Sequence, residues 1–131
     1  MDKTKLVSLV KAEAKLLKKF ATIKQINKLD KESLNANSVW ECIYGQMTGN
    51  CFGNAATELI KLSCKKVYYK NENRKISGNL SRGNILTMDR ELYWSPIEVF
   101  IDQDVNTING NNTALIAYLK GETKTLKFTK F

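Results

Sequence analysis

Residues 38–64 read SVWECIYGQMTGNCFGNAATELIKLSC and place two helix signals on either side of a glycine-rich segment. Ser38 is a good N-cap residue, and Glu41 three residues later completes a capping box. Apolar side chains then recur at helical spacing as far as Met47. The pattern predicts a short, strongly apolar helix over about 38–48.

Gly45, Gly49 and Gly53 lie four residues apart in a chain with only seven glycines. Gly49 in the left-handed conformation would end the first helix, and Asn54 would cap a second helix over about 54–65. We therefore favour a helix–turn–helix corner, in which Gly45 and Gly53 are sites of close packing.

The same glycine-rich segment admits a second interpretation, in which it binds an anion or a small ligand. A P-loop needs a lysine near its end, and a dinucleotide-binding loop needs a preceding strand. Here the lysine is missing and a helix is predicted before the loop, so both motifs fail. A less specialised site at the start of the second helix is the alternative, and its residues would be Gly49, Asn50, Gly53 and Asn54.

The N-terminal segment has the pattern of a long amphipathic helix over about 4–27. Apolar residues recur there at three- and four-residue steps, and neither glycine nor proline interrupts them. A polar connector follows to about residue 34. Residues 1–31 hold nine lysines and three acidic residues. Four of these lysines are expected on the solvated side of the helix, free to meet a partner: Lys11, Lys15, Lys18 and Lys19.

Two further helices are predicted in the C-terminal third of the chain. Ser95 as N-cap and Pro96 at the first helical position give a strong start signal for a helix over about 95–102. A second helix over about 113–120 is closed by Gly121 in the C-cap role.

Strand-like patterns are fewer and shorter. KVYY, residues 66–69, is rich in residues that prefer extended structure, and it opens an irregular segment at about 66–92. The tail KTLKFTKF, residues 124–131, alternates apolar and basic residues as a one-sided strand would.

Together these patterns predict one mainly α-helical domain over residues 1–131, with minor antiparallel strands allowed as an α+β variant. Residues 1–34 would form the basic helix and its connector, and residues 35–131 the helical body. The residues expected in the core are Trp40, Tyr44, Leu59, Ile60, Trp94, Phe100 and Leu115.

Composition excludes several classes of catalytic and metal site. The chain has no histidine, so neither a Ser–His nor a Cys–His pair can form. Cys42, Cys51 and Cys64 match no common zinc spacing and are expected to be reduced, buried thiols. Glu98 and Asp102 are expected on a solvated helix face rather than as an acid–base pair. We therefore predict a non-enzymatic protein with no metal and no cofactor.

The formal net charge is +8, from 21 basic and 13 acidic residues, and only three of the basic residues are arginines. Lysine suits nonspecific contact with phosphates, whereas base reading in a groove favours Arg, Asn or Gln. The N-terminal lysines would therefore contact nucleic acid or an acidic protein. A purely solvated face is one alternative, and another is a helix whose apolar stripe docks into a partner's groove. The oligomeric state is left open.

The sequence also bears on the compartment. Its apolar runs are too short to span a membrane, and lysine or glutamate interrupts the N-terminus where a signal peptide would be apolar. We therefore expect a cytoplasmic protein with no membrane partner.

Three blocks of the chain resemble small uncharacterised proteins encoded by tailed bacteriophages of gut bacteria. The blocks are WECIYGQMTGNCFGNAATELIKLSC, YWSPIEVFI and ALIAYLKGET, within about residues 38–121. The resemblance implies a context in the host-cell cytoplasm or in the virion, and it implies no activity and no functional residue.

These observations favour a small binding or interaction protein over an enzyme. The hypothesis is a phage-type accessory factor that contacts nucleic acid or a bacterial host protein, with inhibition of a host defence as one role. The alternative is a small ligand- or anion-binding protein, or an enzyme, built around the glycine-rich corner at residues 45–54.

Overall fold

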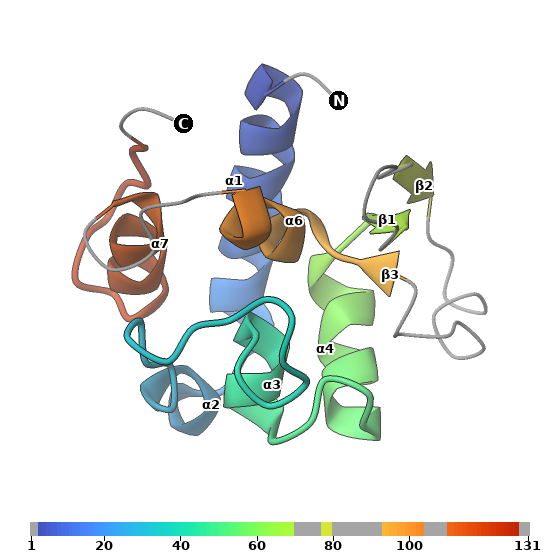
Figure 1. Cartoon of the computed structure of the whole chain (residues 1–131). Helices are drawn as coiled ribbons and strands as arrows, with labels where there is room; N and C mark the ends of the chain where they lie inside the picture. The colour runs from blue at the N-terminus through green and yellow to red at the C-terminus, as the bar shows by residue number, and fades with distance from the viewer. Residues whose placement is uncertain (1–2, 70–76, 80–92, 104–109, 129–131) are drawn as a thin grey trace.

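Helix α1 (Lys3–Phe20) runs through the middle of the structure and is covered on one side by later helices (Figure 1). The computed structural model describes residues 3–69, 77–79, 93–103 and 110–128. α1 contacts α4 (Asn54–Ser63), α6 (Pro96–Gln103) and α7 (Asn111–Leu119). These contacts bury its apolar stripe, whose buried members are Leu6, Val10, Ala14 and Leu17. The predicted mainly α-helical domain with a long N-terminal helix is thereby confirmed.

The predicted helix over 4–27 is wrong in its extent, because the chain breaks after Phe20 and restarts as α2 (Ile23–Asn27). Thr22 is extended and forms a capping box with Gln25. The Gln25 amide N–H donates to the Thr22 hydroxyl at 3.1 Å, and the Thr22 N–H donates to the Gln25 side chain at 2.9 Å. These bonds satisfy two N–H groups at the new helix start and so stabilise the break.

Helix α3 (Ile43–Thr48) begins four residues later than the capping-box pattern at Ser38 predicts. The Ser38 carbonyl accepts hydrogen bonds from the N–H groups of Glu41 and Cys42, and its hydroxyl accepts one from Trp40. These contacts make a turn, and Cys42 becomes the true N-cap of α3. The following helix α4 is confirmed close to its predicted bounds.

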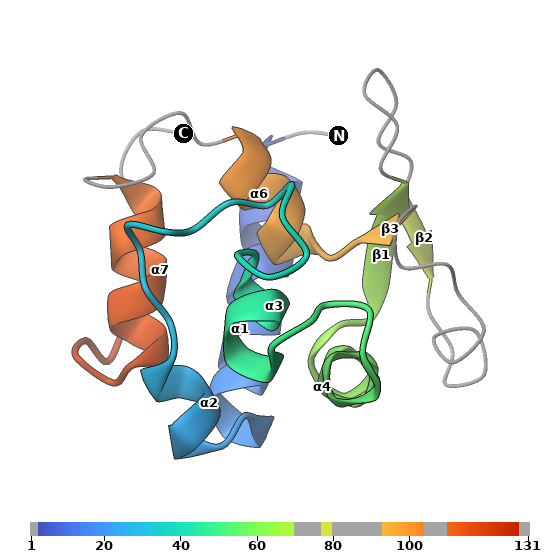
Figure 2. The same ribbon diagram turned by 60° about the horizontal axis from the view of Figure 1, so that its bottom comes forward.

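A three-stranded antiparallel sheet lies on the opposite side of the helices from α7 (Figure 1 and Figure 2). Its central strand is β1 (Lys66–Tyr69), which pairs with β2 (Ser77–Asn79) and β3 (Tyr93–Trp94). The strand predicted at KVYY is confirmed.

The strand predicted for the tail is wrong within residues 124–128, and residues 129–131 lie outside the described part of the chain. Leu126 and Phe128 instead pack against the core as an irregular segment. The ring of Phe128 lies 4.5 Å from the ring of Phe100, centroid to centroid.

The start of α6 and the end of α7 are capped by the residues that the sequence predicts. The Glu98 N–H donates to the Ser95 hydroxyl at 3.4 Å, in the N-cap arrangement expected before Pro96. Gly121 follows α7 with a φ of 80°, which is the left-handed conformation that glycine adopts most easily.

Six of the seven predicted core residues are buried, and Trp40 is the exception with 67% of its surface exposed. The prediction for Trp40 is wrong because this residue lies in the turn before α3 rather than on a helix face. Tyr44, one helical turn further along, is fully buried instead.

None of the described helices is both long enough and apolar enough to cross a membrane.

Candidate functional site

Lys11, Lys15, Lys18 and Lys19, which we name the lysine face, lie on the side of α1 away from its buried stripe. Lys11, Lys15 and Lys19 are exposed, and Lys18 is half-buried. The side of α1 that could dock into a partner's groove is already covered by α4, α6 and α7. The groove-docking interpretation is therefore wrong, because the apolar stripe is buried within the fold, and the lysines lie on the side of α1 that remains at the surface.

Two of these lysines contact aromatic rings from other parts of the fold and are not simply solvated. The Lys18 ammonium lies 4.5 Å from the centroid of the Tyr118 ring in α7, and the Lys11 ammonium lies 6.0 Å from that of Phe128. The prediction that all four lysines are free is therefore corrected for Lys18 and Lys11. These contacts connect the lysine face to α7 and the C-terminal segment.

No exposed carboxylate on α1 neutralises the lysine face. Glu13 is the acidic residue between Lys3 and Phe20, and only 2% of its surface is exposed. It falls between Val10 and Leu17 on the buried stripe, at steps of three and four residues. Its place on that stripe could therefore be read from its spacing, although the predicted charge of residues 1–31 includes it simply as one of three acidic residues.

The Glu13 carboxyl group is hydrogen-bonded to three residues outside α1. The Ile97 N–H in α6 donates to Oε1 at 2.8 Å, and the Tyr44 hydroxyl in α3 contacts Oε2. The Ser95 side chain also hydrogen-bonds to this carboxyl group. Buried polar groups need such partners, because an unpaired one costs free energy in the core.

Counting hydrogens shows which form of Glu13 fits this network. The Tyr44 hydroxyl contacts Glu13 and also the Ser63 hydroxyl at 2.8 Å, and Ser63 contacts the Leu59 carbonyl oxygen at 2.9 Å. Two hydroxyl groups supply two hydrogens for these three contacts, and a carbonyl oxygen cannot donate. The third hydrogen therefore comes from a protonated Glu13.

Electrostatics point the same way. Burial, with a smaller contribution from the nearby Glu98, raises the pKa of Glu13 to about 7, although hydrogen bonding with Tyr44, Ile97 and Ser95 opposes this rise. Burial also raises the pKa of Tyr44 well above its usual value. Glu13 is thus about half protonated near pH 7, so it removes less positive charge from α1 than an exposed glutamate would.

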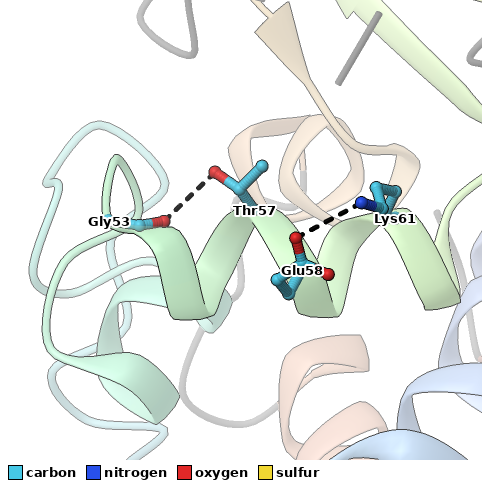
Figure 3. A network of polar contacts seen from close by, with 4 residues as sticks. All are labelled: Gly53, Thr57, Glu58 and Lys61. Carbon is cyan, nitrogen blue, oxygen red and sulfur yellow. Dashed lines mark hydrogen bonds and ion pairs between the residues drawn. The ribbon is translucent and has the colours of Figure 1, made fainter. Parts of the chain in front are cut away.

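Helix α4 offers a contrast to α1, because its charges pair. The Lys61 ammonium lies 3.2 Å from the Glu58 carboxylate one turn earlier (Figure 3). The same view shows the Thr57 hydroxyl donating to the Gly53 carbonyl oxygen, at 3.1 Å, which ties the first turn of α4 to the corner before it. A row of lysines with no exposed carboxylate on the same helix is therefore a property of α1 that α4 does not share.

The glycine-rich corner forms as predicted, and each of its glycines has a structural role. An added Cβ at Gly45 would lie 2.3 Å from the Val39 carbonyl oxygen, so Gly45 is a site of close packing. Gly49 caps α3 with a φ of 96° in the left-handed conformation. Gly53 is the N-cap of α4, and an added Cβ there would lie 3.2 Å from the Asn50 carbonyl oxygen.

The contacts of this corner do not add support to the interpretation that it binds an anion. The Asn50 side chain accepts a hydrogen bond from the Phe52 N–H at 2.9 Å, so it shapes the loop itself. Asn54 is the first residue of α4 rather than its cap, which corrects the predicted role. A ligand role for Gly49, Asn50, Gly53 and Asn54 stays a prediction.

A small cavity lies elsewhere, where α1 meets the end of α4 and the start of β1. Its volume is about 130 Å³. Glu13 and Ser63 line it, together with Leu9, Ala12, Leu16, Cys64, Lys65, Lys66 and Pro96. It contains no residue of the glycine-rich corner, so cavity and corner do not combine into one ligand site.

The three cysteines are buried thiols that form no disulfide, as predicted. A hydrogen bond with Cys51 and burial both raise the pKa of the Cys42 thiol, which disfavours the nucleophilic thiolate. Within the described residues no group of three acidic or cysteine side chains is placed to hold a metal ion.

The solvated acidic face predicted for α6 is correct for Asp102 and wrong for Glu98. Asp102 is exposed and accepts a hydrogen bond from the Asn37 side chain at 3.4 Å, but Glu98 is buried. Glu98 lies in the strongly apolar helix α6, whose residues Pro96–Ile101 are all buried.

Comparisons with protein-family models, curated proteins and solved structures find no match for this chain. The resemblance of its three blocks to bacteriophage proteins therefore stays a prediction.

Proposed function

We propose that this protein is a non-enzymatic binding protein whose lysine face contacts the phosphate backbone of nucleic acid. The observation that carries the proposal is the charge of the lysine face: Lys11, Lys15 and Lys19 are exposed, while the carboxyl group of α1 is buried and hydrogen-bonded in the core. Phosphate contacts need positive charge at the surface but no particular base-reading side chain. The scarcity of arginine agrees with binding that does not read sequence.

Salt dependence tests this proposal directly. Each phosphate neutralised on duplex DNA contributes roughly 0.9 to the slope of log affinity against log salt. Replacing Lys11, Lys15 and Lys19 with glutamine should therefore weaken binding and flatten the slope by about two to three units. Anisotropy titrations of a labelled DNA duplex at several salt concentrations measure both effects. Lys18 is left in place because it packs on Tyr118.

The matched control removes the same charge from a different part of the surface. Lys24, Lys28 and Lys31 are exposed on and after α2, and their replacement with glutamine should leave most of the slope intact. Equal flattening by both triple variants would reduce the proposal to a general charge effect. No binding by the wild-type protein to either duplex or single-stranded DNA at low salt would contradict it outright.

The alternative partner is an acidic bacterial protein, and the resemblance to phage proteins supports a setting in which such a host factor is present. A pull-down from bacterial lysate with and without nuclease separates the two partners. Nucleic-acid binding predicts nuclease-sensitive capture that falls with salt, whereas a host protein retained through both treatments would favour the inhibitor role.

A further inference from the structure

We propose that the nucleic acid bound by the lysine face is single-stranded, with bases stacking on the aromatic rings beside the lysines. This inference rests on the proposed function and extends its site from α1 to α7 and the C-terminal segment. It follows from the pairing of lysines with rings on this one surface.

The rings are placed at the edge of the lysine face by packing. α7 contacts α1, and Tyr118 near the end of α7 lies under the Lys18 ammonium. Phe128 lies with its ring against the buried Phe100 and has the Lys11 ammonium over it. Both rings are only half-buried, so each is anchored in the protein and still reaches the surface.

A third ring lies at the end of the same helix. Phe20 is 40% exposed, and the Lys19 ammonium lies 5.2 Å from its centroid. Three of the four lysines in the lysine face are therefore accompanied by an aromatic ring. Exposed Lys120, Lys124 and Lys127 add further positive charge along the C-terminal segment.

This alternation of charge and ring suits a single strand better than a duplex. In a duplex the base faces are stacked on one another, so a protein ring beside the phosphates finds no base to contact. In a single strand each phosphate can pair with a lysine while the adjoining base stacks on a ring, without sequence preference. An ammonium can move from the ring to a phosphate, because lysine is long and flexible.

The experiment compares two labelled probes under one low-salt condition, an oligothymidine and a duplex of equal length. A length of about 12 nucleotides falls within the range of known single-strand sites. The wild-type protein should bind oligothymidine more tightly. Replacing Tyr118 and Phe128 with leucine should weaken oligothymidine binding by roughly fivefold or more and leave duplex affinity nearly unchanged. Leucine retains apolar packing but offers no ring.

Three further variants separate the possible results. Tyr118→Phe should retain wild-type binding, because the ring is kept. Phe52→Leu with Tyr69→Leu removes two exposed rings outside the lysine face and should change neither affinity. Tyr118→Leu alone, checked by thermal unfolding, should show part of the loss, and it serves if the double variant does not fold.

Equal wild-type affinity for the two probes, or equal losses on both probes in the leucine variants, would overturn the single-strand inference. The proposed function would survive that result if replacement of Lys11, Lys15 and Lys19 still weakened duplex binding. Failure to bind either probe would overturn both.

Discussion

At the scale of single residues, Glu13 shows how a carboxyl group is held in a helical core. An ionised carboxylate would lose several kcal/mol of hydration there, but the neutral acid can both donate and accept hydrogen bonds. Its contacts join α1 to Tyr44 in α3 and Ile97 in α6, and through Tyr44 to Ser63 in α4. One polar group therefore links four helices whose other mutual contacts are largely apolar.

Trp40 is the residue at which sequence and structure disagree most, and its exposure leads to a prediction. Replacing Trp40 with alanine should lower the free energy of unfolding by less than about 1 kcal/mol, because little apolar surface is buried there. The matched control is Trp94, which is 5% exposed, and its replacement with alanine should cost about 3–5 kcal/mol. Urea denaturation measures both.

A loss of several kcal/mol at Trp40 would contradict its exposed position in the turn. A small change in the free energy of unfolding would mean that the large, exposed ring of Trp40 contributes little to stability. Such a ring is a candidate anchor for a protein partner.

At the scale of elements, the sequence predicts most helices because their signals are local. Ser95 with Pro96, Gly49 and Gly121 act within a few residues of themselves, and each ends or begins a helix where expected. The late start of α3 could not be read in this way, because it depends on Gly45 packing against the backbone of Val39, and the Ser38 pattern is equally compatible with a turn.

The break after Phe20 and the path of the tail were missed for different reasons. Thr22 and Gln25 do form a recognisable capping box, but continuous apolar periodicity favours an unbroken helix. The alternating tail has a strand pattern, yet Phe128 finds its partner in Phe100 of α6 rather than in a neighbouring strand. Tertiary contacts of this kind are not encoded in spacing.

The close approach at Gly45 yields a prediction for the corner. Gly45→Ala should destabilise the protein by roughly 1–3 kcal/mol, the usual cost of overpacking, because the new Cβ meets a backbone oxygen at 2.3 Å. This cost would exceed the helix propensity that alanine gains over glycine, about 1 kcal/mol. Gly53→Ala is the control, since its contact is 3.2 Å. Thermal unfolding of the two variants should rank Gly45→Ala as the less stable, and the reverse order would contradict the packing role.

At the scale of the whole molecule, burial of Glu13 both tightens the core and leaves the charge of α1 on the surface. The candidate site was therefore partly predictable: the lysines follow from the helical pattern, and their number from composition. The rings beside them did not follow, because Tyr118 lies 100 residues after Lys18 in the chain and Phe128 lies 117 residues after Lys11. Only the packing of α7 and the tail against α1 brings them together.

The same carboxyl group predicts how the stability of the whole protein depends on pH. The pKa of Glu13 rises on folding from 4.5 to about 7, so the folded state holds a proton that the unfolded state releases. Its contribution is fully present below about pH 4.5, falls as the pH rises toward 7, and is lost above that value. At about 1.4 kcal/mol per pKa unit, the contribution is of the order of 3 kcal/mol.

Glu13→Gln tests this dependence, because glutamine cannot ionise but matches the neutral acid in shape. Its amide N–H can donate to Tyr44, and its oxygen can accept from the Ile97 N–H. Urea denaturation between about pH 5 and pH 8 should show wild-type stability falling with pH, since that range spans the titration, while the variant changes much less. Glu98 faces the same carboxyl group, so Glu98→Gln is the control and should keep most of the wild-type slope. If Glu13→Gln loses stability with pH as steeply as the wild type, Glu13 is not the group that titrates, and the protonated network is wrong.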